Sequence, residues 1–388
     1  MIYIDFPLGS VFGWGVCGKY CARELARRTE TRLLAEEFSP EIVGDAFDWL
    51  ELSRIHYPRE RLAGLAAHAG ITRLDAPLLE CIAGNEMLPQ SANLRGTRTV
   101  GYAFFEDNAL KPAWIDNARR HFDWIATGSS WCTQVLRDHG LQNVSTVVQG
   151  VDHRVFSSRP DGREFLRDRF VVFSGGKLEY RKGQDIAIRA YKVLQDRHKD
   201  VLLVNAWFNP FPYSVHTMHA SRLIRFNPPD SAPSYVDTVN AILADNGIDV
   251  SRVLTLPPQP SASMARVYAN ADVGLFPNRC EGGTNLVLME FMACGGPVIA
   301  SSVTGHTDVV TRDNALLIDA SGTTDVRGAD GELVATWPEP DLDQAIEQLE
   351  RAYRDRDALA ALGARAARDL GAWTWARTAD EFLKLLSS

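Results

Sequence analysis

The stretch 272–305 constrains the fold more than any other part of the chain. It contains two short apolar runs, Val273–Phe276 and Val298–Ser301, and each of them predicts a buried strand. Between them lies Leu286–Cys294, which is apolar on every side except at one position and predicts a short buried helix. Strand, Gly-rich loop, helix and strand form a βαβ unit. The stretch therefore predicts a parallel sheet whose ligands bind at the carboxyl ends of the strands.

The polar exception on the predicted helix is Glu290. A carboxylate on an apolar helix is costly unless it is hydrogen-bonded, so one interpretation is a structural partner such as a backbone cap or an arginine. The other is a pair of ligand hydroxyls, such as those of ribose, because a carboxylate accepts two hydrogen bonds side by side. Gly282 and Gly283 allow backbone N–H groups to approach a ligand, and a helix start capped by Thr284 or Asn285 favours an anion. Together these residues indicate a nucleotide that carries phosphate.

Length and composition exclude several classes of protein. A chain of 388 residues is too long for one ordinary core and suits two domains. Its hydrophobic content of 45% and charged content of 23% are those of a soluble globular protein, and no apolar run approaches the roughly 18 residues of a membrane span. The first residues lack the basic lead and apolar core of a signal peptide, so we expect a cytoplasmic protein. The net charge of −8 argues against nucleic-acid partners, and peripheral contact with the inner face of a membrane stays open.

A second Gly-rich segment follows the first predicted strand, Ile2–Phe6. Gly13, Gly15 and Gly18 precede a helix predicted over Lys19–Arg28, and such a loop brings backbone toward phosphate or sugar in Rossmann-like units. These glycines match the letters G-x-G-x-x-G, yet no acidic residue stands clearly about twenty positions further on at the end of a second strand. A dinucleotide-dependent oxidoreductase is therefore a minority interpretation, and a tight turn without a ligand is the structural alternative.

The run from Glu281 to Glu290, followed by Phe-Met-Ala-Cys-Gly-Gly-Pro-Val-Ile-Ala, resembles the signature of the retaining glycosyltransferases of family 4, which have the GT-B fold. That signature has two glutamates with seven residues between them. In the family the second glutamate binds the ribose of the donor and the first contacts the transferred sugar, so the resemblance gives Glu290 the ribose role. Eight residues separate the glutamates here. Either the loop bulges and Glu281 still reaches the sugar, or backbone groups of Gly283–Asn285 do more of that work.

The segment Ser174–Gly183, after a strand predicted at Phe170–Phe173, carries a second resemblance. It is similar to the family's Gly-Arg-Leu…Lys-Gly element, in which two cations grip the donor diphosphate. Lys177 stands where arginine is usual, Lys182 matches the lysine, and Arg181 is a third candidate cation. Cations fixed here would stabilise the charge that develops on a leaving nucleoside diphosphate. The alternative is a set of solvated basic residues on a loop.

The resemblance covers most of the chain and implies an α/β protein of the GT-B type, with two Rossmann-like domains that face each other across a cleft. Residues 1–155 are the expected acceptor-side domain, joined by a C-terminal helix at about 373–388, and residues 156–372 are the expected donor-binding domain. In the first domain Glu106 follows a predicted strand, where related enzymes often place an ionisable residue near the reacting sugar. An acidic loop start or a helix cap explains it equally well. The catalytic candidates are Glu281, Lys177, Lys182 and Glu106; the donor-binding candidates are Gly13, Gly15, Gly176, Arg181, Gly282, Gly283, Thr284, Asn285, Leu286, Glu290 and Pro258.

The activity implied by the resemblance is a retaining transfer of a sugar from a nucleotide diphosphate sugar to a hydroxyl of a glycan, glycolipid or protein. The nucleotide sugar is a co-substrate, and no cofactor is expected. We expect no metal, because the lysines and helix dipoles can neutralise the diphosphate and the six cysteines form no metal-like pairs. Without an obvious enzymic nucleophile, retention implies front-face attack, with the leaving phosphate accepting the acceptor's proton. The alternatives are a nucleotide-sugar epimerase of the same fold and a non-catalytic nucleotide-sugar-binding protein.

Overall fold

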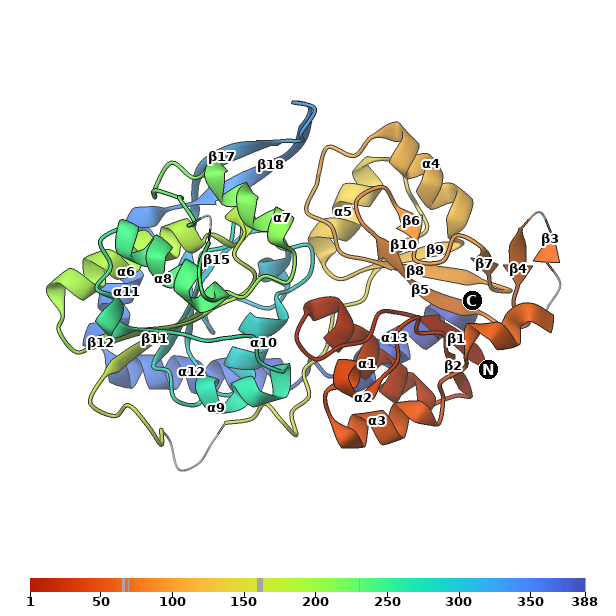
Figure 1. Ribbon diagram of the computed structural model, residues 1–388, viewed down its shortest axis with the longest axis horizontal. Coiled ribbons are helices and arrows are strands. Elements are labelled where there is room, and N and C mark those ends of the chain that lie inside the picture. Colours follow the sequence, from red (N-terminus) through yellow and green to blue (C-terminus); the bar gives the residue numbers. More distant parts are fainter. Residues whose placement is uncertain (65–66, 69, 159–162, 230, 388) are drawn as a thin grey trace. The chain divides into compact units, whose positions relative to one another are not determined.

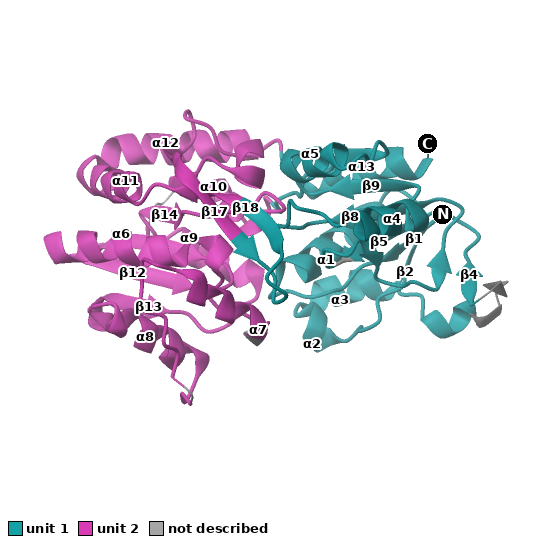
Figure 2. Ribbon diagram, turned by 90° about the horizontal axis from the view of Figure 1, so that it is seen from above, with its two compact units in different colours: residues 1–152, 326–336, 373–388 teal, residues 153–325, 337–372 magenta. Residues whose placement is uncertain are grey.

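The computed structural model describes residues 1–388 except 65–66, 69, 159–162, 230 and 388 (Figure 1). The chain divides into two compact units (Figure 2). Unit 1 comprises residues 1–152, 326–336 and 373–388, and unit 2 comprises residues 153–325 and 337–372. The sequence did not anticipate that the short segment 326–336 belongs to unit 1. Among the helices that the structure describes, none is both long and apolar enough to span a bilayer.

Unit 1 is built around a parallel sheet with the strand order β10-β9-β8-β5-β1-β2, and β6 pairs antiparallel with β5. The interior strands β1, β5 and β8 are mostly apolar and buried, as expected of a parallel sheet covered on both faces, and Asp5 and Glu80 are the charged exceptions. The sheet strands are β1 (Ile2–Asp5), β2 (Thr31–Leu33), β5 (Leu78–Ala83), β6 (Leu88–Pro89), β8 (Thr99–Ala103), β9 (Trp124–Thr127) and β10 (Val144–Thr146), and a separate small sheet contains β3 (Ala67–His68), β4 (Ile71–Arg73) and β7 (Leu94–Arg95).

The helices of unit 1 include one from the end of the chain. Tyr20 of α1 stacks on Trp375 of α13 with ring centroids 5.3 Å apart, and Arg28 pairs with Asp380 at 2.6 Å. The buried residues of α13 recur at helical spacing, so this apolar stripe fixes the C-terminal helix on unit 1. The helices are α1 (Gly13–Ala26), α2 (Pro40–Val43), α3 (Ala46–Ser53), η1 (Arg59–Gly64), α4 (Pro112–His121), α5 (Ser130–Asp138) and α13 (Trp375–Ser387).

The position of Gly13 and Gly15 differs from the prediction. Both were expected in a loop, but α1 already begins at Gly13, and the connecting loop is 6–12. A Cβ on Gly15 would lie 2.6 Å from the backbone nitrogen of Gly9, and a Cβ on Gly18 would lie 2.1 Å from the carbonyl oxygen of Pro7. These glycines therefore allow the first turns of α1 to pack directly on the preceding loop.

Unit 2 contains a second parallel sheet, with the strand order β13-β12-β11-β14-β15-β16. The predicted strands β14 and β15 are found with the expected bounds, and α10 between them begins at Leu286 as predicted. Helices α6 and α11 pack together beside this sheet (Figure 1). The strands are β11 (Phe170–Gly175), β12 (Val201–Ala206), β13 (Val253–Thr255), β14 (Val273–Phe276), β15 (Val298–Ser301) and β16 (Leu316–Ile318).

A hairpin of β17 (Ala320–Arg327) and β18 (Leu333–Pro340) stands apart from both sheets, and its residues are divided between the two units. The helices of unit 2 are η2 (Tyr180–Lys182), α6 (Gln184–Arg197), α7 (Pro212–Val215), η3 (His216–Ala220), α8 (Tyr235–Asp245), η4 (Val250–Arg252), η5 (Ser261–Ser263), α9 (Met264–Tyr268), α10 (Leu286–Ala293), η6 (Thr304–Asp308), α11 (Leu342–Arg354) and α12 (Arg356–Leu370).

Candidate functional site

Five charged side chains form one continuous chain of ion pairs in unit 2, at the carboxyl ends of β11 and β14. Lys177 Nζ lies 2.9 Å from Glu179 Oε1, and Arg181 Nε lies 2.8 Å from Glu179 Oε2. Arg181 also lies 3.4 Å from Glu281 Oε2, and Lys182 Nζ lies 2.5 Å from Glu281 Oε1. We call these residues the charge chain. The structure therefore brings together Lys177, Arg181, Lys182 and Glu281, which sequence reasoning had singled out in two separate segments.

The two carboxylates of the charge chain stay ionised despite their burial. Burial alone would raise the pKa of Glu179, but the charges of Arg181 and Lys177 outweigh it and bring the pKa down to about 2. Burial opposes ionisation of Glu281 in the same way, and the charges of Lys182 and Arg181 keep its pKa below the usual value. Burial lowers the pKa of Lys182, while Glu281 acts in the opposite direction. With three cations and two anions, the charge chain carries a net positive charge, which suits an anionic ligand.

Two glycines shape the loop that carries the cations. Gly176, the first residue after β11, has φ = +119°, and Gly183, the first residue after η2, has φ = +69°. A Cβ on Gly183 would lie 2.0 Å from the carbonyl oxygen of Pro277, at the end of β14. Residues other than glycine rarely adopt such backbone angles. Gly183 thus lets the Lys182 turn lie against the loop that carries Glu281.

The backbone of Glu281 is fixed by the loop that follows β15. Its N–H donates to Thr304 Oγ1 at 2.9 Å, and its carbonyl accepts from the Gly305 N–H at 3.1 Å. A Cβ on Gly305 would lie 1.7 Å from the carbonyl oxygen of Gly283, so only glycine permits this approach. The side chain of Asn278 also donates to Glu281 Oε1. The Glu281 carboxylate is therefore held from several directions, and the eight-residue spacing to Glu290 is accommodated in the loop 282–285.

That loop ends in a strained residue. Asn285 has φ = +65°, and Thr304, on the loop that fixes Glu281, has φ = +46°. Positive φ is uncommon for residues other than glycine, and such strain clusters at functional sites. The Asn285 side chain caps α10 by accepting from the Leu288 N–H at 3.4 Å, as the sequence predicted for Thr284 or Asn285. Gly282, Gly283 and Thr284 are buried beside it, and Leu286 begins the helix half-buried.

His306 is a site residue that sequence reasoning did not select. It is fully buried, and burial lowers its pKa to about 4, so the imidazole is neutral at pH 7. His306 Nδ1 lies 3.2 Å from the Ser301 carbonyl oxygen, which can only accept, so this nitrogen carries the proton. His306 Nε2 then accepts from the Asn285 amide at 3.2 Å. A neutral imidazole therefore orients Asn285, the residue that caps the start of α10.

Glu290 lies on α10 with partners from the segment after β13. Ser261 Oγ donates to Glu290 Oε1 at 2.8 Å, and Tyr268 OH lies 3.3 Å from Glu290 Oε2. Glu290 therefore has hydrogen-bond partners within the protein, as the first of its two interpretations expects. A carboxylate oxygen can accept more than one hydrogen bond, so binding of a ribose by Glu290 stays a prediction. Pro258, on the loop between β13 and Ser261, is exposed.

Arg279, two residues before Glu281, was also missed by sequence reasoning. Its guanidinium is 1% exposed and forms pairs of hydrogen bonds with Asp185, at 2.8 and 2.9 Å, and with Glu339, at 2.7 and 2.6 Å. It also donates to the Tyr180 carbonyl at 2.8 Å and lies over the Tyr180 ring at 3.8 Å. Arg279 therefore ties the Glu281 loop to the start of η2, which carries Arg181 and Lys182. No sequence motif marks an arginine for this role.

The remaining predicted residues, Glu106, Gly13 and Gly15, belong to unit 1, whereas the charge chain, Glu290 and Pro258 belong to unit 2. Glu106 is half-buried and lies three residues beyond the end of β8. Burial, and then the neighbouring charge of Glu106, raise the pKa of Asp107 to about 6. Across the part of the chain that the structure describes, no group of three or more His, Cys, Asp or Glu side chains could hold a metal ion.

Comparison with known proteins gives matches over both units. The model of a family described as glycosyl transferases group 1 matches residues 233–334. A D-inositol 3-phosphate glycosyltransferase of Nocardia farcinica is 33% identical in an alignment of 264 positions, which covers 62% of this chain and 54% of the relative. The chain spans about half the length of the curated relatives it matches.

Two solved structures share the whole fold. Sucrose-phosphate synthase from Thermosynechococcus elongatus superposes with a TM-score of 0.67 at 15% identity, over 99% of this chain and 97% of that one. HepE from Anabaena, in complex with UDP and glucose, superposes with a TM-score of 0.64 at 12% identity, over 100% of this chain and 99% of that one. These likenesses confirm the predicted fold class, a mixed α/β protein with parallel sheets that matches GT-B structures.

Proposed function

We propose that this chain, which is similar to GT-B glycosyltransferases of the family 4 type, transfers a sugar from a nucleotide diphosphate sugar to an acceptor hydroxyl. The observation that carries the proposal is the charge chain. It gathers three cations at the carboxyl ends of two parallel strands, where ligands of such sheets bind. A donor diphosphate is the anion that fits this charge and this position.

The cations would act on the leaving group. As the bond between the anomeric carbon and the diphosphate oxygen breaks, negative charge develops on that oxygen, and Lys182, Arg181 and Lys177 can stabilise it. Lys182 and Arg181 are already ion-paired with Glu281, so a diphosphate would compete with Glu281 for them. Glu281 could then turn its carboxylate toward hydroxyls of the transferred sugar. The loop 282–285 and the capped start of α10 would supply backbone donors to the phosphates.

We further propose that the transfer retains the configuration of the anomeric carbon and needs no metal. The acceptor oxygen would form its bond on the face from which the diphosphate departs, and the leaving phosphate oxygen would accept the proton of the acceptor hydroxyl. His306 is fully buried, both of its ring nitrogens are engaged by Asn285 and the Ser301 carbonyl, and its pKa is lowered by burial to about 4, so it supports the loop rather than serving as a base. Fixed cations already provide the charge that a divalent ion would otherwise supply.

The proposal is tested by incubating the protein with UDP-, GDP-, ADP- and dTDP-sugars and a mixed panel of glycan, glycolipid and peptide acceptors, with and without EDTA. We expect one class of nucleotide sugar to release its nucleoside diphosphate, and this release to depend on an acceptor and to be insensitive to EDTA. NMR of the product should show retained configuration at the anomeric carbon. An inverted product would refute the front-face mechanism. Binding of a nucleotide sugar with neither transfer nor hydrolysis would identify a non-catalytic binder, and conversion of the sugar without an acceptor would identify an epimerase.

A further inference from the structure

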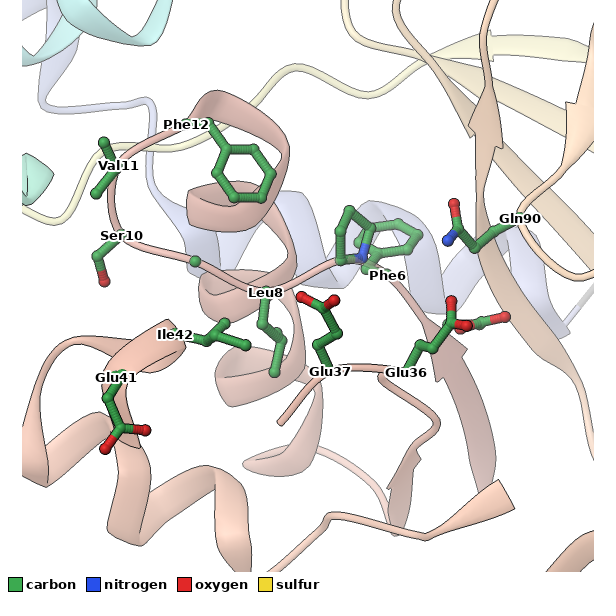
Figure 3. Close-up of a pocket in the computed structure, with 13 residues that line it drawn as sticks. Phe6, Leu8, Ser10, Val11, Phe12, Glu36, Glu37, Glu41, Ile42 and Gln90 are labelled. Atoms are coloured by element: carbon green, nitrogen blue, oxygen red, sulfur yellow. The ribbon is translucent and has the colours of Figure 1, made fainter. Parts of the chain in front are cut away.

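A pocket of about 400 Å³ lies wholly within unit 1, at the carboxyl end of β1 (Figure 3). We propose that this pocket takes the acceptor, and that the part of the acceptor bound there is a neutral polyhydroxylated ring without phosphate or carboxylate. That the ligand of this pocket is an acceptor rests on the proposed function. The class of ligand follows from the pocket itself.

The walls of the pocket come from three neighbouring parts of unit 1. The loop that follows β1 provides an apolar wall with Phe6, Leu8 and Phe12, and Ile42 of α2 adds to it (Figure 3). Glu36 and Glu37, from the segment after β2, and Gln90, from the segment after β6, provide polar groups around the same space. A volume of several hundred Å³ with an apolar wall and a few polar groups is typical of a small-ligand site.

The charge of the lining is one-sided. Its residues include four carboxylates, those of Asp5, Glu36, Glu37 and Glu41, and neither lysine nor arginine. Asp5 is buried and compensated, because Arg59 pairs with it at 2.7 Å and Ser91 donates to it at 2.6 Å. The three glutamates are exposed, and among the described residues they enter no ion pair.

Two cations that contact residues of the pocket lining, Lys19 and Arg59, are already engaged. Lys19 Nζ lies 3.3 Å from Ser10 Oγ, which belongs to the lining, but the same ammonium pairs with Asp48 at 2.8 Å. Arg59 donates to Ser91 and to the Leu34 carbonyl as well as to Asp5. Neither cation is therefore available to neutralise an anionic ligand, and the pocket is negative as a whole.

Such a pocket suits ring hydroxyls and repels phosphate. Carboxylates accept hydrogen bonds from vicinal hydroxyls, and the Gln90 amide can both donate and accept. The apolar wall suits the C–H face of a saccharide or cyclitol ring. A phosphate would instead stand among like charges without a cation to pair with it. The proposed ligand therefore differs from the phosphorylated inositol in the name of the Nocardia farcinica relative, D-inositol 3-phosphate glycosyltransferase.

The test is ligand-observed NMR on the full-length protein with matched pairs of probes, namely myo-inositol against D-inositol 3-phosphate and glucose against glucose 6-phosphate. We expect the neutral member of at least one pair to bind at least about tenfold more tightly than its phosphorylated partner. The double variant Glu36→Gln/Glu37→Gln should reduce that ratio severalfold. Glu86→Gln, which changes an exposed glutamate of unit 1 outside the pocket lining, should leave the ratio unchanged.

The inference is overturned if the phosphorylated probes bind as tightly as the neutral ones, if no probe binds, or if the double variant leaves the ratio as it was. Titration with UDP and GDP in the same samples separates this result from the proposed function. Nucleotide binding together with a preference for phosphorylated probes would overturn the ligand class alone. Neutral probes that bind without any nucleotide binding would overturn the proposed function and leave the ligand class standing.

Discussion

Replacement of Glu80 by glutamine should stabilise unit 1 near neutral pH. Glu80 lies on β5, in register with Asp5 of β1, and its carboxylate is fully buried. Burial is the main reason for its raised pKa, the neighbouring charge of Asp5 is the second, and together they raise it to about 8. The folded protein therefore favours the protonated, neutral form of Glu80, which Glu80→Gln imitates at every pH.

The size of the effect follows from this pKa and the ordinary value of 4.5. Between these two values the folded state holds a proton that the unfolded state has released, so the free energy of unfolding falls as the pH rises. At about 1.4 kcal/mol for each pH unit, the wild type loses about 3 kcal/mol between pH 4.5 and 7, and about 5 kcal/mol in all by pH 8 and above. We expect Glu80→Gln to gain about these amounts over the wild type at the same pH, and to gain little near pH 4.

Hydrogen–deuterium exchange of the β5 and β8 amides measures this gain strand by strand. Wild type and variant are compared at the same pH, so that intrinsic exchange rates cancel. Protection in the variant should exceed that of the wild type by a margin that grows from pH 5 to pH 8. Glu86→Gln, at an exposed position of the same unit, serves as the matched control and should show no such growth. A gain that is constant with pH, or that is largest in acid, would refute the reasoning.

Three further predictions concern unit 2. Lys182→Met should lower the free energy of unfolding by about 3 kcal/mol in urea unfolding, because Glu281 loses its closest cation. The double variant with Glu281→Gln should recover more than half of that loss. Additive effects of the two substitutions would contradict the ion pair. Arg279→Met should lower the free energy of unfolding by about 3–5 kcal/mol, because Asp185 and Glu339 lose the cation that they share. A thermal unfolding midpoint equal to that of the wild type would show that the network is dispensable. EDTA should leave the affinity for the preferred nucleotide sugar unchanged in calorimetric titration, whereas a loss that Mg²⁺ restores would reveal a metal requirement.

The sequence predicted the centre of unit 2 well because local signals there agree with the tertiary structure. Strands β14 and β15 are short apolar runs bounded by breakers. Helix α10 starts directly after Asn285, which caps it, and ends before Gly295, which has φ = +82°. Lys177, Arg181 and Lys182 could be selected because cations after a buried strand have a recognisable use. The contacts of Arg181 and Lys182 with Glu281 depend on the long-range pairing of β11 with β14, which local patterns do not show.

Other features depend on packing that leaves little trace in the sequence. The glycines of α1 indicated a loop by composition, yet they serve close approach between the helix and the backbone of Gly9 and Pro7. The hairpin of β17 and β18, in a segment that resembles a polar loop, contributes Glu339 to the Arg279 network. His306 becomes a site residue through its contact with Asn285, 21 residues away, and Glu179 through the local turn that places Lys177 and Arg181 against its carboxylate. Neither residue type in its position carries a sequence signal that sets it apart.

We propose that the charge chain binds the diphosphate of a nucleotide sugar. Isothermal titration of UDP, GDP, ADP and dTDP into the wild type and into Lys182→Met tests this binding. Lys192→Met, at a half-buried lysine of α6 that pairs with Asp196, serves as the matched control. We predict that one nucleotide binds the wild type and the control with similar affinity and binds Lys182→Met at least about tenfold more weakly, since one charge-assisted contact is lost. Equal affinity in all three proteins, or no binding of any nucleotide to the wild type, would contradict the claim.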